Sequence, residues 1–140
     1  MTFRATYKLR FGHCDPAGIA YYPRLLELVD AAIEDWTPAA LGLDRRRMHM
    51  ELGLGLPTVE LRTRFVAPCR MGELLDFDVT VTRVGTSSVD LDVAVTCGGA
   101  PRFSAQLVQV LIATDRAAAV AWPAPMRARL VAAPPERETA

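Results

Sequence analysis

The sequence predicts an α+β domain in which one amphipathic helix packs against a sheet of antiparallel strands. Three observations favour this fold class. The chain has 140 residues, the size of one domain, and 51% of them are apolar, enough for a core without metals or disulfides. One strand-like segment and one long helical segment come first, and four strand-like segments follow. Because one helix on one sheet makes two layers, we expect the sheet to curl around the helix.

The first two elements follow from hydrophobic periodicity. Residues 3–11 alternate between apolar and polar or charged side chains, the period of a half-buried strand. A helix is expected to begin at Pro23, whose missing N–H costs nothing at a helix start. Its apolar stripe has helical spacing and comprises Leu26, Val29, Ile33 and Trp36. Thr37-Pro38 is expected to break the helix after about four turns, or to restart it as a short turn, with Gly42 as the final cap.

The rest of the chain is strand-rich. Four segments that alternate, or are apolar on both faces, predict strands at 58–66, 74–84, 88–97 and 103–114. The stretch 43–56 is irregular, and we interpret its run Arg45-Arg46-Arg47 as a solvated loop. Residues 126–131 are expected to form a last helical turn. The sequence thus predicts a single domain over residues 1–132 and a disordered tail over 133–140.

Charge and cysteine content exclude several classes of function. Lys plus Arg and Asp plus Glu both total 16, so no net charge attracts nucleic acid or an anionic membrane. The N-terminal segment lacks the continuous apolar run of a signal peptide or membrane span. The three cysteines are odd in number and contain no CxxC, which favours a reducing compartment and no structural zinc. We therefore expect a cytoplasmic protein without a metal or other resident cofactor.

Chemistry concentrates in residues 12–23. Asp15 lies in a loop rich in glycine and proline, just ahead of the predicted helix start. A helix start offers unpaired backbone N–H groups that can hold an oxyanion, and a carboxylate beside them can act as nucleophile or general base. Gly18 would allow close approach of a ligand. The residues alone leave a second interpretation equally open, in which Asp15 only caps a short turn over 16–19.

The run HCDPAGIAYYP at residues 13–23 resembles the signature of the 4-hydroxybenzoyl-CoA thioesterase family, in which Asp-Pro-Ala-Gly-Ile is followed by an aromatic pair and a proline. The similarity continues weakly at 28–32, 55–59 and 64–68. The order of elements is similar to that family's hotdog fold from end to end. The resemblance implies an acyl-CoA thioesterase that needs no cofactor, since CoA is part of the substrate.

The resemblance also implies roles for individual residues. Asp15 matches the catalytic carboxylate, and Tyr22 matches the position whose backbone N–H polarises the thioester carbonyl. Tyr21 matches an aromatic position beside the acyl group, and Gly18 matches the loop glycine. Asp30 matches a helix aspartate near the acyl end of the pocket, although a buried structural aspartate is the competing interpretation. An aromatic or other bulky acyl group is expected, because Tyr21, Tyr22 and Trp36 offer aromatic surface, with a core position as the equal alternative for Trp36.

One departure concerns the phosphates of CoA. The hydroxybenzoyl enzyme has basic residues in the turn before its fourth strand, whereas residues 85–88 read GTSS here. Arg83 is the one nearby arginine and becomes the candidate phosphate ligand, with Arg62 and the 45–47 run as further candidates.

Two other functions stay open from the residues alone. A His13–Asp15 pair would suit a hotdog hydratase or dehydratase. A module that binds acyl-CoA without releasing thiol is the non-catalytic alternative. Cys14 is interpreted as a small hydrophobic residue rather than a nucleophile, and His49 receives no role.

We expect an oligomer, at least a dimer and, with the resemblance, a tetramer. Five strands with much apolar content face a single covering helix, so an apolar outer sheet face would need a partner subunit.

Overall fold

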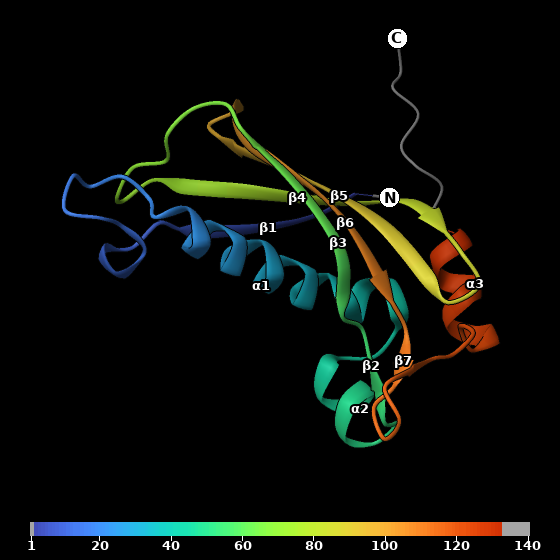
Figure 1. The fold of residues 1–140 in the computed structure, drawn as a ribbon. Coiled ribbons are helices and arrows are strands. Elements are labelled where there is room, and N and C mark those ends of the chain that lie inside the picture. The colour runs from blue at the N-terminus through green and yellow to red at the C-terminus, as the bar shows by residue number, and fades with distance from the viewer. Residues whose placement is uncertain (1, 133–140) are drawn as a thin grey trace, which may run out of the picture.

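A computed structural model describes residues 2–132 and shows a two-layer arrangement of one sheet and one long helix (Figure 1). The antiparallel sheet has five strands, which in spatial order are β1 (Thr2–Lys8), β4 (Leu74–Val84), β5 (Ser88–Cys97), β6 (Ala100–Val110) and β3 (Thr58–Phe65). Helix α1 (Tyr22–Leu41) packs mainly against β1 and β4 on one face of this sheet. The predicted α+β class is confirmed.

Strict alternation fixes the middle of the sheet. Every second residue is buried from Leu75 to Val79 in β4 and from Val89 to Val95 in β5, and the bounds of both strands are those predicted from the sequence. The pairs Phe77↔Val95 and Val79↔Val93 set the register between the two strands. A shift of one residue would turn these side chains to solvent, so the apolar pattern determines the pairing.

The outer face of the sheet is polar. Arg4 makes a bidentate hydrogen bond to Asp78, with Nε to Oδ1 at 2.7 Å and Nη2 to Oδ2 at 3.0 Å. Thr6 Oγ1 donates to Asp76 Oδ1 at 2.6 Å. The apolar outer face on which our expectation of an oligomer rested is therefore not present over these strands.

Helix α1 is longer than predicted, because Thr37-Pro38 does not break it. It runs for 20 residues and includes Pro38 in its last turn. A proline there removes one N–H donor, but the hydroxyl of Thr37 donates to the carbonyl of Ile33 at 2.8 Å and ties the backbone locally. The helix ends at Gly42 as predicted, with φ of 80° and an N–H bond to Pro38 O at 3.0 Å.

The first strand is shorter than predicted. Strand β1 ends at Lys8, and a 3-10 turn, η1 (Phe11–His13), follows. The side chain of Phe11 is 81% exposed and lies in this turn, so the half-buried strand predicted over residues 3–11 does not reach it. The apolar alternation continues in the sequence beyond the end of the β1–β4 pairing, and periodicity alone could not locate that end.

The interpretation of residues 45–47 as a loop is also wrong. They form the first turn of α2 (Arg45–Met50), whose N-cap Asp44 accepts a hydrogen bond from the backbone N of Arg47 at 2.8 Å. The predicted strand 103–114 is divided between β6, which begins at Ala100, and the short β7 (Ile112–Ala113). Strand β7 lies between β2 (Leu54–Gly55) and β8 (Ala118–Ala119) in a small second sheet.

The C-terminal part of the described chain is helix α3 (Ala124–Ala132), longer than the predicted single turn. Met126 and Leu130 are its buried residues. The expected disordered tail, 133–140, lies outside the described residues. Within residues 2–132, no helix is long and apolar enough to cross a membrane.

Candidate active site

The loop after β1 holds Asp15 in a hydrogen-bonded turn. The Asp15 Oδ1 atom accepts from the backbone N–H groups of Ala17 at 2.9 Å and Ile19 at 3.4 Å. The Asp15 backbone accepts from Gly18 N at 3.0 Å and donates to Ile19 O at 2.9 Å. Gly18 has φ of 75°, a conformation that a side chain would strain. The second carboxylate oxygen, Oδ2, makes no hydrogen bond within residues 2–132, and Asp15 is exposed.

Helix α1 begins directly after this loop and presents a free donor. The neighbouring Tyr21 N–H is used, because it donates to His13 O at 2.9 Å. Tyr22 is the first helical residue, and among the described residues its N–H has no hydrogen-bond acceptor. Pro23 follows and has no N–H of its own. The positive end of the helix dipole therefore carries an unpaired N–H at Tyr22, a position suited to holding an oxyanion.

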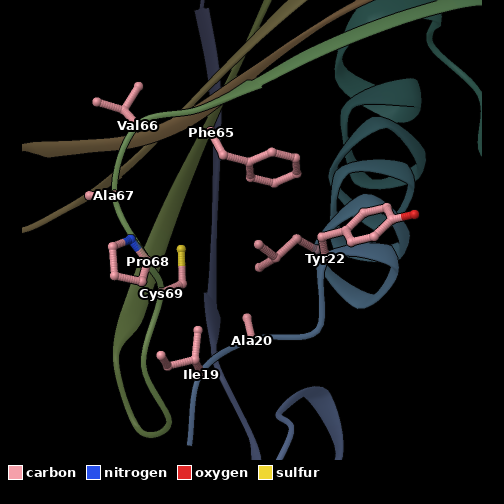
Figure 2. A pocket seen from close by; sticks show the side chains of 9 residues that line it. Ile19, Ala20, Tyr22, Phe65, Val66, Ala67, Pro68 and Cys69 are labelled. Carbon is pink, nitrogen blue, oxygen red and sulfur yellow. The ribbon is translucent and has the colours of Figure 1, made fainter. Parts of the chain in front are cut away.

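A pocket of about 330 Å³ is lined in part by Tyr22 (Figure 2). It is lined from three segments: the loop before α1, the first turn of α1, and the end of β3 with the residues that follow. The lining residues are Ile19, Ala20, Tyr22, Leu25, Phe65, Val66, Ala67, Pro68 and Cys69. Figure 2 shows the 66–69 segment on one side, Ile19 and Ala20 at the base and Tyr22 opposite.

Aromatic rings form one wall of the pocket. The rings of Tyr22 and Phe65 lie 6.1 Å apart in an edge-to-face arrangement, and Phe65 stacks on Phe103 at 5.5 Å. Tyr22 and Phe65 are each about half exposed, at 58% and 45%. Because both rings are partly exposed, another planar group can pack against them, and such contacts between aromatic rings are energetically favourable.

The chain matches the family model described as "Thioesterase-like superfamily" over residues 9–130. The chain belongs to this superfamily. Among curated relatives, the 1,4-dihydroxy-2-naphthoyl-CoA hydrolase of Thermosynechococcus vestitus is 31% identical, over 91% of this chain and 88% of the relative. The chain is thus a thioester hydrolase, and its resemblance to the 4-hydroxybenzoyl-CoA thioesterase family is confirmed.

Solved structures agree with this assignment. The 4-hydroxybenzoyl-CoA thioesterase from Pseudomonas sp. strain CBS-3 superposes with a TM-score of 0.82 at 26% identity, covering 91% of this chain and 98% of that one. An Asp-to-Asn mutant of a 4-hydroxybenzoyl-CoA thioesterase, in complex with 4-hydroxybenzoyl-CoA, gives 0.84 at 25% identity, covering 92% and 98%. The hotdog fold predicted from the sequence is confirmed.

The structure of this thioesterase brings some predicted site residues together and leaves others apart. Tyr22 lines the pocket, and Asp15 and Gly18 lie on the loop that continues into its base. Tyr21 is 57% exposed and outside the lining, with its ring 5.9 Å from that of Tyr22. Asp30 is exposed on α1, about 12 Å beyond Tyr22 at 1.5 Å per residue.

Two further residues lie away from the pocket. Arg83 is near the opposite end of β4, nine residues or about 30 Å from Leu74, where the strand leaves the pocket loop (Figure 1). Trp36, which we expected to offer aromatic surface to the site or to belong to the core, is 3% exposed and belongs to the core.

Sequence reasoning missed the pocket wall at residues 65–69. Phe65 ends β3, but residues 66–69 are irregular and have no period, so they give no strand or helix signal. The one available indication was the weak similarity at residues 64–68, which carries no chemistry by itself. Cys69 in this wall is 2% exposed, and burial raises the pKa of its thiol.

The structure does not support a His13–Asp15 dyad or an activated Cys14. The Nδ1 atom of His13 accepts from the backbone N of Arg10 at 2.9 Å, and within residues 2–132 His13 forms no hydrogen bond or ion pair with Asp15. Burial and the nearby Asp15 charge raise the pKa of the Cys14 thiol, which disfavours the nucleophilic thiolate. Across the described residues, no group of three or more His, Cys, Asp or Glu side chains is arranged to hold a metal.

Proposed function

We propose that this thioesterase hydrolyses the CoA thioester of a hydroxylated aromatic acid, with Asp15 and the Tyr22 N–H as the reacting groups. The observation that carries the proposal is the pairing of a free carboxylate oxygen on the loop with an unpaired N–H at the mouth of an aromatic pocket. Either group alone is common; their combination beside a pocket suits acyl transfer.

The proposed chemistry uses each group once. The Tyr22 N–H donates to the thioester oxygen and stabilises the negative charge that develops there. Asp15 Oδ2 either attacks the carbonyl carbon, expelling CoA thiolate and leaving an anhydride that water then cleaves, or removes a proton from the attacking water. Both routes give the free acid and CoA. Because Oδ1 is held by two backbone N–H groups, the carboxylate is already oriented before substrate binds.

The aromatic acyl group is proposed on two grounds. The Tyr22 and Phe65 rings leave room for a planar group between the helix and the 66–69 wall. The relatives at 25% identity or more include proteins named for 1,4-dihydroxy-2-naphthoyl-CoA and for 4-hydroxybenzoyl-CoA, both of which have hydroxylated rings. A pocket of about 330 Å³ is at the small end of ligand sites, which suits the acyl group rather than the whole of CoA.

The remaining site residues take supporting roles in this proposal. Tyr21 borders the acyl group, Gly18 keeps the loop open, and Asp30 accepts a hydrogen bond from a ring hydroxyl at the far end of a long acyl group. The phosphates of CoA would meet Arg83 from a neighbouring subunit, given its distance from the pocket, or the exposed Arg70, which directly follows pocket residue Cys69. The enzyme needs no cofactor and acts in the cytoplasm, where its free cysteines stay reduced.

A thiol-release assay tests the proposal. The panel contains 4-hydroxybenzoyl-CoA, 1,4-dihydroxy-2-naphthoyl-CoA, unsubstituted benzoyl-CoA, and hexanoyl- and palmitoyl-CoA as aliphatic controls. We expect the highest kcat/KM with one of the two hydroxylated aromatic esters. Equal or higher kcat/KM with the aliphatic esters would contradict the assignment of substrate class, and binding without thiol release from any ester would favour the acyl-CoA-binding module.

We also propose a homodimer joined through the β3 edges, with a tetramer as the larger assembly. Strand β3 is an edge strand with one unpaired side, and α1 packs mainly against β1 and β4 rather than against β3. Leu61, which pairs with the buried Leu107, is 47% exposed, and nearby Val59 is 60% exposed. An apolar edge strand is the surface through which two copies pair around a two-fold axis.

Sedimentation velocity at micromolar concentration tests the assembly. The wild-type chain should sediment as a dimer or tetramer, and Leu61→Asp should shift it towards monomer by placing a charge on the edge. The matched control is Val131→Asp on α3, at 55% exposure, which should leave the assembly unchanged. A monomeric wild type would defeat the proposal.

A further inference from the structure

The pocket wall and the Asp15 loop are joined into one unit. Residues 66–73, which connect β3 to β4, have no regular secondary structure over most of their length. Four backbone hydrogen bonds tie them to the loop after β1: Ala20 N to Cys69 O at 2.9 Å, Met71 N to Gly18 O at 3.0 Å, Gly72 N to Leu9 O at 2.7 Å, and Leu9 N to Glu73 O at 2.8 Å. The two loops lie at the same end of the sheet (Figure 1). A displacement of one therefore displaces the other.

One residue of the sheet, Arg102 in β6, holds both ends of the 66–73 segment. Its backbone carbonyl accepts from Val66 N at 2.8 Å and from Ala67 N at 3.1 Å. Its guanidinium donates from Nη1 to Pro68 O at 2.7 Å. The same guanidinium makes a bidentate bond to Glu73, with both N–O distances at 2.7 Å. An irregular segment is thereby fixed to a strand whose own position is set by two neighbouring strands.

Glu73 is the partner of Arg102 in this arrangement, which we call the Arg102–Glu73 clamp. Its Oε1 atom also accepts from the backbone N of Arg70 at 2.6 Å, and Cys97 Sγ lies 3.5 Å from Oε2. The hydrogen bond from Arg102 lowers the pKa of Glu73 to about 2, so the pair is charged at neutral pH. The side chains of Arg102 and Glu73 are only 16% and 23% exposed. Charged pairs of this bidentate kind with little water around them hold their geometry tightly.

We propose that Arg102 is a positioning residue for thioester hydrolysis: through Glu73 and Pro68 it fixes the pocket wall, and with it the Asp15 loop, relative to the Tyr22 N–H. This inference rests on the proposed function. Arg102 is outside the pocket lining, so we assign it no contact with the acyl group. Its effect on rate comes from alignment, because a displacement of about 1 Å between reacting groups can cost on the order of 10²-fold.

The chain offers a matched control. Arg4 makes a bidentate pair with Asp78 on the outer face of the same sheet, at 2.7 and 3.0 Å, but between two regular strands and without contact to either loop. Arg4→Met and Arg102→Met thus remove the same kind of interaction. If the Arg102–Glu73 pair only stabilises the sheet, both variants should lose stability while kcat stays near that of wild type.

The first measurement separates kcat from KM at a temperature well below unfolding. We expect Arg102→Met to lower kcat about 10- to 100-fold with KM within about threefold. Arg102→Lys should recover part of kcat, since an ammonium can still bridge Glu73 and the Pro68 carbonyl, whereas Arg4→Met should stay within twofold of wild type. An unchanged kcat in Arg102→Met, with a loss of Tm like that of Arg4→Met, would overturn the proposal.

The second measurement needs no enzymatic activity. Cys69 is buried in the clamped segment, so its alkylation by iodoacetamide, followed by site-resolved mass spectrometry, reports opening of the pocket wall. Arg102→Met should raise its labelling rate at least about tenfold over wild type, and Arg4→Met should not. Equal labelling rates in all three proteins would refute the role of Arg102, whether or not any acyl-CoA is hydrolysed. Faster labelling in Arg102→Met, in a protein that releases no thiol from any acyl-CoA, would refute the proposed function alone. Should Arg102→Met fail to assemble, Glu73→Gln, which removes one acceptor oxygen of the pair, takes its place with the same readouts.

Discussion

Replacing Asp15 by asparagine separates its chemical role from its structural one. Both turn hydrogen bonds end on one oxygen, Oδ1, and come from the backbone N–H groups of Ala17 and Ile19. An asparagine keeps an oxygen in that place and converts only Oδ2 into an amide nitrogen. We therefore expect Asp15→Asn to fold and bind acyl-CoA as the wild type does, while losing the group that attacks carbon or takes a proton.

The magnitudes follow from these contacts. Loss of a positioned general base lowers kcat by about 10²–10⁴-fold, which is about 3–5 kcal/mol of transition-state stabilisation. Asp15→Ala, in contrast, also removes the acceptor of both turn bonds. Because a typical hydrogen bond contributes about 1 kcal/mol, the alanine variant should be less stable by about 1–2 kcal/mol, and the asparagine variant should not.

The assay compares thiol release, equilibrium binding of the preferred acyl-CoA, and urea unfolding for the two variants. Asp15→Glu adds a third point, since one methylene moves the carboxylate by about 1 Å and should cost on the order of 10²-fold in kcat. Near wild-type kcat in Asp15→Asn would show that Asp15 does not react. An equal loss of stability in the asparagine and alanine variants would refute the assignment of the turn bonds to Oδ1.

Three further outcomes are expected. Phe65→Ala removes one aromatic wall of the pocket, so KM should rise about tenfold or more for aromatic acyl-CoA but change little for hexanoyl-CoA; equal effects on both esters would argue against ring stacking. His13→Ala removes the acceptor for Arg10 N and should cost about 1 kcal/mol in urea unfolding with kcat near wild type, whereas a loss of kcat with a changed pH profile would revive the dyad. Glu73 has a pKa near 2 in the folded chain and an ordinary value of 4.5, so its contribution to stability is complete above pH 4.5 and is lost as pH falls towards 2. The stability difference between wild type and Glu73→Gln in urea should therefore shrink below pH 4.5, and a difference independent of pH would contradict the lowered pKa.

Local patterns predicted the regular elements and failed where long-range contacts decide. The bounds of β4 and β5 follow from strict alternation, which any window of the sequence displays. The end of β1 depends on where its pairing with β4 stops, which no local pattern marks. Helix α1 continues through Pro38, which local rules for helix breakers do not predict. The Arg102–Glu73 pair joins residues 29 apart, and no spacing rule connects them. Sequence reasoning therefore located the loop of Asp15 but not the wall that faces it.

The two interpretations of Asp15 that the sequence left open are compatible in the structure. A capping aspartate and a catalytic aspartate seem to exclude each other when the side chain is treated as one acceptor. A carboxylate has two oxygens, and here Oδ1 alone serves the turn through Ala17 and Ile19. The turn therefore supports the proposed chemistry, because it fixes the rotation of the carboxylate and leaves Oδ2 without a partner within residues 2–132. A loop that donated hydrogen bonds to both carboxylate oxygens would be more stable, but it would leave no oxygen free to react. A turn that binds only Oδ1 is therefore what we expect of a carboxylate that attacks carbon or activates water.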